Sequence, residues 1–252
     1  MPSPVAAWVD VPLEADREAD RQMLRCWWSP PAAGAPRAGV LVLPEVFGVN
    51  RWVRSVADRL ADRGYAALAV PLFQHTAPGL ELGYGTEDLQ LGRLHKDRTT
   101  AARLLADLGC AVTWLGRQAG EGPLGCVGFC FGGHVAMLAA SLASVRATCS
   151  FYGAGVASGR PGGGPPTLAV VPSIPGHLLC MFGRSDPLIP PADVEAVRQA
   201  LAAGGPRHRL RLLDAGHGFL CEDRPDYNAA AAAEGWREML DWFEQHLGSA
   251  GP

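Results

Sequence analysis

The residues best suited to do chemistry in this sequence are a cysteine, an aspartate and a histidine that each follow a short apolar run. Cys130 stands at the centre of Gly128-Phe-Cys-Phe-Gly132, between such a run and a segment rich in small residues. A strand that turns sharply into a helix needs neighbours with almost no side chain two positions from its central residue. It then exposes that residue beside a helix N-terminus, where partial positive charge favours a thiolate. The pattern predicts a nucleophile elbow, although a glycine-rich turn with a buried cysteine has the same letters.

Two further side chains follow downstream in loops. Asp186 lies four residues after an apolar run that ends at Phe182, and His217 lies four residues after a run that ends at Leu213. Taken alone, Asp186 could be an ordinary turn residue, and His217 could be an ordinary surface histidine. The chain order of nucleophile, acid and histidine is that of the α/β-hydrolases, in which both partners follow strands. We therefore predict a catalytic triad of Cys130, Asp186 and His217.

The loop after the first buried run can supply the remaining groups of such a site. Pro44-Glu-Val-Phe-Gly-Val-Asn50 follows the apolar residues 40–43. In α/β-hydrolases this loop gives one backbone N–H of the oxyanion hole, and the residue after the nucleophile gives the other. These donors would be Val46 and Phe131. Glu45 could be an ordinary loop carboxylate, or it could control the proton of the cysteine thiol.

Alternating strands and helices must position these residues. Apolar runs without alternation, typical of strands buried on both faces, cover residues 40–44, 65–71, 124–129, 147–152, 177–182 and 208–213. Helical patterns cover 50–63, about 99–117, 131–144, about 191–203 and a terminal helix near 236–247. Two early runs, 7–11 and 23–28, indicate a hairpin at a sheet edge. We predict one α/β-hydrolase domain over 1–252, with a mostly parallel sheet, helices on both faces, and an edge hairpin and connector in 1–36.

Composition and charge exclude some classes of function. The 252 residues hold 22 Lys and Arg against 25 Asp and Glu, a formal net charge of −3, which excludes a strongly basic nucleic-acid binder. Seven scattered cysteines are typical of reduced thiols. The N-terminus lacks the pattern of a secretory signal, and no apolar stretch approaches the roughly 18 residues of a membrane span. We expect a cytoplasmic protein with neither a nucleic-acid nor a membrane partner.

Two segments lack the hydrophobic periodicity of a helix or a strand. Residues 73–98 follow a strand and include His75, Tyr84, Arg93 and Arg98, at a place where a lid over a site can form. Residues 155–176 contain six glycines and five prolines. That composition predicts an exposed surface connection without a function of its own.

Together these motifs resemble those of the dienelactone hydrolase family, a branch of the α/β-hydrolases with a cysteine nucleophile. The resemblance covers about residues 37–247 and rests on P-E-V-F-G-V-N at Glu45, G-F-C-F-G-G at Cys130, F-Y-G at 151–153, G-x-x-D at Asp186 and A-G-H-G-F at His217. It implies that Cys130 is the nucleophile, His217 the general acid and base, and Asp186 its orienting partner. It also implies that Glu45 keeps the cysteine largely as a thiol until substrate binding displaces the carboxylate. Cys130 would then attack an ester or lactone carbonyl to form an acyl-enzyme.

One departure from the family pattern bears on the substrate. Family members that hydrolyse dienelactone hold its carboxylate with arginines, one of them four residues after the catalytic histidine, where this chain has Cys221. Arg224, Arg93 or Arg98 could substitute. The expected substrate is a small ester or lactone, and a neutral or partly aromatic ester would also suit the apolar side chains. Its expected contacts are Phe47, Phe73, Arg93, Arg98 and Phe219.

Two other functions fit parts of the sequence. Cys126 and Cys130 form C-x-x-x-C, which would suit a redox or thiol-sensing protein, although redox motifs have C-x-x-C spacing and Cys126 should lie in a buried strand. The other alternative is an α/β-hydrolase scaffold that binds without catalysis. The sequence has no H-E-x-x-H, no Cys/His ligand spacing and no G-x-G-x-x-G, so we expect neither a metal nor a nucleotide cofactor.

Overall fold

A computed structural model describes residues 5–14, 22–120 and 122–248. In these residues, eight strands form one sheet in the order β1-β2-β4-β3-β5-β6-β7-β8. The first two, β1 (Ala7–Pro12) and β2 (Met23–Ser29), pair antiparallel, and β2 is also antiparallel to β4 (Ala66–Ala69). All other pairs are parallel, and they join β4, β3 (Gly39–Leu43), β5 (Leu124–Phe129), β6 (Val145–Phe151), β7 (His177–Gly183) and β8 (His208–Leu213). The predicted edge hairpin and mostly parallel sheet are present.

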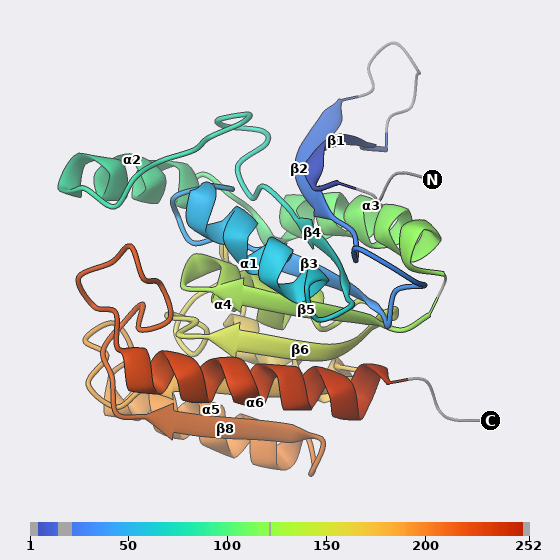
Figure 1. Cartoon of the computed structure of the whole chain (residues 1–252). Coiled ribbons are helices and arrows are strands. Elements are labelled where there is room, and N and C mark those ends of the chain that lie inside the picture. Colours follow the sequence, from blue (N-terminus) through green and yellow to red (C-terminus); the bar gives the residue numbers. More distant parts are fainter. Residues whose placement is uncertain (1–4, 15–21, 121, 249–252) are drawn as a thin grey trace.

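Helices cover both faces of this sheet (Figure 1). Helices α1 (Arg51–Ala61) and α6 (Ala229–Leu247) lie on one face, and α3 (Ala101–Ala119), α4 (Phe131–Ala139) and α5 (Pro191–Ala203) lie on the other. Strands β3, β4 and β5 are buried along their whole length, as expected for a parallel sheet covered on both sides. None of the described helices is long and apolar enough to cross a bilayer.

Polar side chains start three of the helices. Asn50, Thr100 and Asn228 each accept a hydrogen bond from the backbone N–H three residues later, at 3.2, 3.3 and 3.0 Å. Such caps satisfy backbone donors that have no partner within the helix. Asn50 is thus the N-cap of α1.

The structure corrects three predictions about individual elements. Residues 73–98, expected to be irregular, contain α2 (Thr86–Lys96), which buries only Gly92 and His95 and therefore has no apolar stripe. The helix expected over 131–144 ends at Ala139. Residues 155–176 contain the 3₁₀ helix η2 (Thr167–Ser173) and are not wholly exposed. The connection between β1 and β2 lies mostly outside the described residues.

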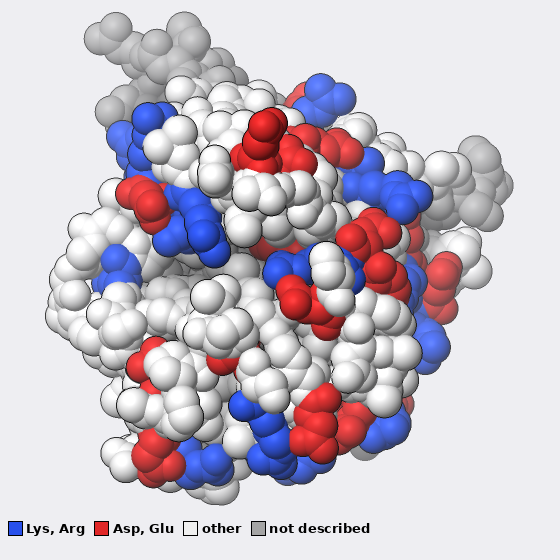
Figure 2. Space-filling view, turned by 90° about the vertical axis from the view of Figure 1, so that its left-hand side faces the viewer, with Lys and Arg blue, Asp and Glu red and all other residues white. Residues whose placement is uncertain are grey.

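The parallel strands bring distant loops to one end of the sheet. Glu45 follows β3, Cys130 follows β5, Asp186 follows β7 and His217 follows β8. Because the carboxyl ends of parallel strands lie at the same edge, these four residues gather there. In Figure 2, which looks onto the end toward which the arrows of Figure 1 point, the surface is hollowed and Lys and Arg side chains lie around the hollow.

Candidate active site

Cys130 occupies the sharp turn between β5 and α4. Its backbone has φ 53° and ψ −116°, a conformation that residues with a side chain rarely adopt. The turn is tight, because a Cβ on Gly128 would lie 2.0 Å from the Gly132 carbonyl oxygen, and a Cβ on Gly132 would lie 2.3 Å from that of Leu43. Only glycine fits at these two positions. The G-x-C-x-G pattern thus forms an elbow, and the side chain of Cys130 is partly exposed.

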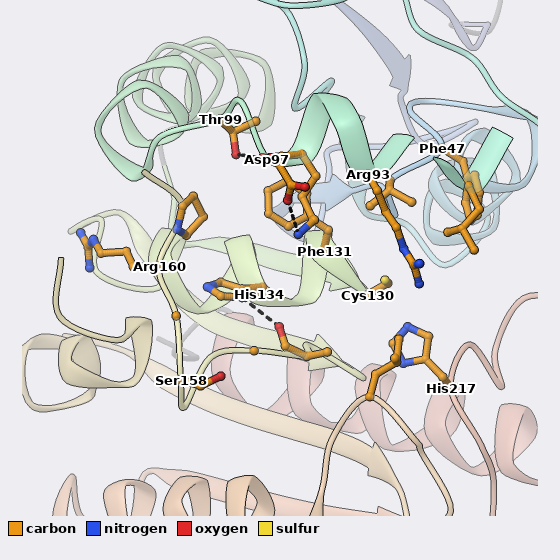
Figure 3. A pocket seen from close by; sticks show the side chains of 18 of the residues that line it. Phe47, Arg93, Asp97, Thr99, Cys130, Phe131, His134, Ser158, Arg160 and His217 are labelled. Carbon is orange, nitrogen blue, oxygen red and sulfur yellow. Dashed lines mark hydrogen bonds and ion pairs between the residues drawn. The ribbon is translucent and has the colours of Figure 1, made fainter. Parts of the chain in front are cut away.

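His217 and Asp186 form a buried hydrogen bond beside this elbow. His217 Nδ1 lies 2.8 Å from Asp186 Oδ2, and neither residue is more than 5% exposed. The Asp186 carboxylate is fixed in turn, because its Oδ1 accepts a 2.8 Å hydrogen bond from the Leu188 N–H. His217 directs Nε2 toward Cys130 (Figure 3). This nitrogen is buried and makes no hydrogen bond to a described residue. The three residues of the predicted triad are therefore brought together.

The surroundings of His217 favour its protonated form. Burial alone would lower the pKa of this imidazole. Negative charge on the Cys130 sulfur, present once the thiol is ionised, and the hydrogen bond with Asp186 together raise that pKa to about 10. A protonated His217 can donate Nε2–H toward Cys130 or toward a group bound there.

Glu45 is a buried carboxylate paired with an arginine. The residue is 1% exposed, and its Oε1 accepts a 2.8 Å hydrogen bond from Arg224 Nη1. Its Oε2 is buried with no hydrogen-bond partner in the described structure. Burial raises the pKa of Glu45, although the positive charges of Arg224 and His217 act in the opposite direction. Arg224 also contacts Asp226 at 3.1 Å, so two carboxylates share this arginine.

Tyr152 lies beside His217, and no role was predicted for it from the sequence. It follows β6 with φ 37°, and its ring packs edge-on against that of His217 at 5.2 Å. Its buried hydroxyl makes no hydrogen bond to a described residue. Burial, with a further contribution from the Glu45 charge, raises the pKa of this phenol well above its usual value. Tyr152 therefore stays neutral, and the F-Y-G motif was the signal that could have identified it.

One cavity of about 530 Å³ joins these groups. Cys130 and His217 line it, as do Val46 and Phe131, the two expected backbone donors. Figure 3 shows Cys130 and His217 at one side of the cavity and Arg160 and Thr99 at the other. The other charged residues of its wall are Arg93, Lys96, Asp97 and Arg224. The cavity is therefore large enough for a small ester and predominantly positive in its wall charges.

The structure separates the five expected substrate contacts into two groups. Phe47 and Arg93 line the cavity. Phe73 is buried and stacks on Phe131 instead, with ring centroids 5.9 Å apart. Phe219 is buried against Tyr152, and Arg98 borders a separate, smaller hollow. Phe73, Phe219 and Arg98 therefore do not line this cavity.

The glycine-rich segment after β6 also contributes to the wall. Gly155, Ser158, Gly159, Arg160, Pro161 and Gly162 all line the cavity. The segment is held near the start of α3, because the Ala101 N–H donates a 2.8 Å hydrogen bond to the Pro161 carbonyl. The predicted loop is present, but it is not only an exposed surface connection, because six of its residues form part of this wall. Its composition indicated a loop but could not show what the loop packs against.

The described structure also bears on metal binding and on thiol redox chemistry. Within the described residues, no group of three or more His, Cys, Asp or Glu side chains is arranged to hold a metal ion. The seven cysteines are free. Cys126 is fully buried in β5, where burial raises the pKa of its thiol well above the usual value.

Comparison with known proteins identifies the family to which the chain belongs. The family model described as the dienelactone hydrolase family matches residues 26–247. The chain belongs to the dienelactone hydrolase family. The resemblance predicted from the five motifs is confirmed.

Relatives cover most of the chain. A candidate carboxymethylenebutenolidase of Synechocystis sp. is 41% identical over 211 residues, which are 82% of this chain and 86% of that protein. The carboxymethylenebutenolidase of Pseudomonas putida is 28% identical over 221 residues, 84% of this chain and 87% of that protein. A crystal structure of a candidate dienelactone hydrolase from Klebsiella pneumoniae superposes with a TM-score of 0.82 at 27% identity, covering 96% of this chain and 98% of that one.

Membership in the dienelactone hydrolase family confirms two broader predictions. The fold is the α/β-hydrolase fold, and the chain is an enzyme of the class that hydrolyses carboxylic esters or lactones.

Proposed function

We propose that this member of the dienelactone hydrolase family cleaves a small carboxylic ester or lactone through a covalent intermediate on Cys130. The observation that supports it most strongly is the 2.8 Å hydrogen bond between His217 and Asp186, formed beside the elbow cysteine in a shared cavity. A nucleophile, an imidazole and an orienting carboxylate in this order are the parts that acyl transfer needs.

Acylation begins with Cys130 as a thiol and with the Glu45 carboxylate paired to Arg224. Substrate binding moves the Glu45 carboxylate from Arg224, Glu45 takes the proton of Cys130, and the sulfur attacks the carbonyl carbon. The N–H groups of Val46 and Phe131 then donate hydrogen bonds to the oxyanion. When the tetrahedral intermediate collapses, the alcohol oxygen leaves with a proton from His217, and a thioester remains on Cys130.

Deacylation reverses these proton transfers. Neutral His217 takes a proton from water as the water oxygen attacks the thioester carbonyl. The second tetrahedral intermediate expels the sulfur, which recovers its proton from Glu45, and the acid product leaves. Asp186 keeps the His217 ring in the tautomer and orientation that both steps require.

Arg224 connects the substrate to this proton switch. A carboxylate on the substrate would compete with Glu45 for the Arg224 guanidinium, since both groups accept its hydrogen bonds. Release of Glu45 then gives the site a base of raised pKa. An anionic ester or lactone would therefore activate Cys130 as it binds, whereas a neutral ester would have to displace Glu45 without that competition.

Replacing the nucleophile tests this mechanism. Cys130→Ala should abolish hydrolysis of a p-nitrophenyl ester, and Asp186→Asn should lower kcat by about 100-fold or more, because His217 loses its orienting partner. Cys110→Ala is the matched control, since this free, half-buried thiol lies in α3. Turnover and circular dichroism would be measured for all three variants.

Three outcomes would contradict the proposal. Full turnover by Cys130→Ala would exclude the covalent mechanism. Absence of turnover in the unmodified protein, across neutral esters and carboxylate-bearing lactones, would favour a binding scaffold. Loss of free thiols under mild oxidation together with absent ester turnover would favour a thiol-sensing protein.

A further inference from the structure

The segment 80–96, here called the strap, lies along the loop that carries Glu45 and Val46. The Leu82 N–H donates a 2.9 Å hydrogen bond to the Phe47 carbonyl, and Asn50 Nδ2 donates a 3.2 Å hydrogen bond to the Leu82 carbonyl. Glu81 forms an isolated β-bridge with Gly48. The first part of the strap is thus fixed to the loop by backbone contacts.

The second part of the strap is α2, which buries two residues, Gly92 and His95. Residues three apart share one face of a helix, so these two form its inner contact. A Cβ on Gly92 would lie 2.3 Å from the Val46 carbonyl oxygen and 3.0 Å from its carbonyl carbon. The backbone of α2 therefore packs directly on the carbonyl of the Val46–Phe47 peptide group, and no side chain fits between them. This peptide group is joined through the Val46 Cα to the expected N–H donor.

The other inner residue leads to the second expected donor. The His95 ring lies 6.2 Å from that of Phe73, and Phe73 stacks on Phe131 at 5.9 Å with planes 7° apart. Phe131 is the first residue of α4, directly after Cys130. The two buried residues of α2 thus contact Val46 directly and Phe131 through one aromatic ring.

We propose that Gly92 is a positioning residue for the oxyanion hole, and that α2 acts as a fixed buttress that sets the distance between the Val46 and Phe131 N–H groups. The inference rests on the proposed function, because it assigns the oxyanion to these two donors. It differs from the lid expected for residues 73–98, since α2 here holds the donors and does not need to move over the substrate.

An oxyanion hole works only at short donor distances. Donors must lie about 2.7–3.1 Å from the oxyanion, and the loss of one donor costs about 100- to 1000-fold in kcat. A methyl group at position 92 must move either α2 or the Val46 peptide, because 2.3 Å is far below a normal carbon–oxygen contact. Alanine is otherwise the better helix residue, so an activity loss would not come from a weaker helix.

Gly92→Ala tests the buttress, with Gly109→Ala and Gly116→Ala as matched controls. Both control positions lie in α3, where an added Cβ meets nothing within 4 Å. For Gly92→Ala we expect kcat for a p-nitrophenyl ester to fall about 10- to 100-fold with KM changed less than about threefold, as for a mispositioned transition-state contact. Both controls should keep the kcat of the unmodified protein.

Alkylation of Cys130 separates this role from general damage. Iodoacetamide reacts by displacement at a saturated carbon and forms no oxyanion, so its rate with Cys130 should stay unchanged in Gly92→Ala. The rate is obtained by subtracting the labelling of Cys130→Ala. Where Gly92→Ala fails to fold, Phe73→Leu provides the second test, with the same pattern expected because Phe131 loses its stacked neighbour.

The results separate the two proposals. Unchanged kcat in folded Gly92→Ala, or alkylation that falls in proportion to kcat, would overturn the buttress. The same holds for Phe73→Leu where it is the variant used. Full turnover by Cys130→Ala would instead overturn the proposed function itself.

Discussion

Glu45 is a carboxylate that lies almost fully out of water and pairs with one arginine. Its second oxygen has no hydrogen bond within the described residues, and Arg224 supplies the nearest positive charge at 2.8 Å. Burial of a charge is costly unless it is paired. The charged form of Glu45 therefore depends on its pairing with Arg224.

This pairing predicts how Arg224 contributes to stability. Arg224→Gln should lower the free energy of unfolding by about 3 kcal/mol at neutral pH, because it leaves the Glu45 charge buried without its partner. Adding Glu45→Gln should recover part of that loss, since the unpaired charge is then gone. Urea unfolding of the two single variants and the double variant measures the coupling. An equal loss in Arg224→Gln and the double variant would contradict this account.

At the scale of elements, Asn50 joins α1 to the strap. Its Oδ1 accepts the Val53 N–H at 3.2 Å, while its Nδ2 donates to the Leu82 carbonyl and to the Tyr84 hydroxyl, both at 3.2 Å. One buried amide therefore caps a helix and fixes the strap to the loop of Glu45. A carboxylate of the same shape could perform only the first of these tasks.

Two substitutions separate the tasks of Asn50. Asn50→Asp should keep the cap of α1 but lose both donors to the strap, so hydrogen exchange should speed up at residues 80–85 and not in α1. Asn50→Ala should lose cap and donors together and cost about 2 kcal/mol in unfolding free energy. Exchange monitored by mass spectrometry provides the test. Equal protection of the strap in Asn50→Asp and the unmodified protein would show that these donors do not hold it.

The elements differ in how far local sequence determines them. The elbow was predictable because its glycine spacing is local: a Cβ on Gly128 would meet the carbonyl of Gly132, four residues away. The need for glycine at position 132 comes from the Leu43 carbonyl of another strand, which no local pattern shows. The strands were predictable because continuous apolar runs are needed when both faces are covered. Helix α2 was not predictable, because its inner face packs through Gly92 against a carbonyl from another part of the chain. The helix therefore buries no apolar side chains at helical spacing. The Arg224 partner of Glu45 was equally hidden, since the two residues are 179 positions apart and no spacing rule relates them.

At the scale of the whole molecule, three histidines lie at the end of the sheet opposite the cavity. His177 and His208 begin β7 and β8, and His246 lies near the end of α6. The rings of His177 and His246 stack at 3.7 Å. Burial lowers the pKa of both His208 and His246 to about 4. The charges of Arg207 and His177 lower the pKa of His208 further, and those of His177 and Arg209 do the same for His246.

These three histidines predict that acid lowers the stability of the fold at a place far from the candidate active site. The folded pKa lies below the usual value of about 6.5, so between about pH 6.5 and pH 4 the unfolded chain binds more protons and stability falls as the pH falls. Thermal unfolding at pH 7.5 and pH 5 should show a lower Tm at pH 5. In His208→Leu, which cannot titrate, the drop should be smaller by roughly 2 °C. An identical drop in both proteins would place the acid sensitivity elsewhere.

The φ of 53° at Cys130 has a consequence for protein engineering. Holding a residue with a side chain in this conformation costs about 1–3 kcal/mol, a penalty that glycine does not carry. Cys130→Gly should therefore make the protein more heat-resistant while removing its sulfur. Because Cys130 is the proposed nucleophile, we expect a library selected for heat resistance alone to enrich inactive members. Each round of selection would then need a turnover assay beside the thermal one.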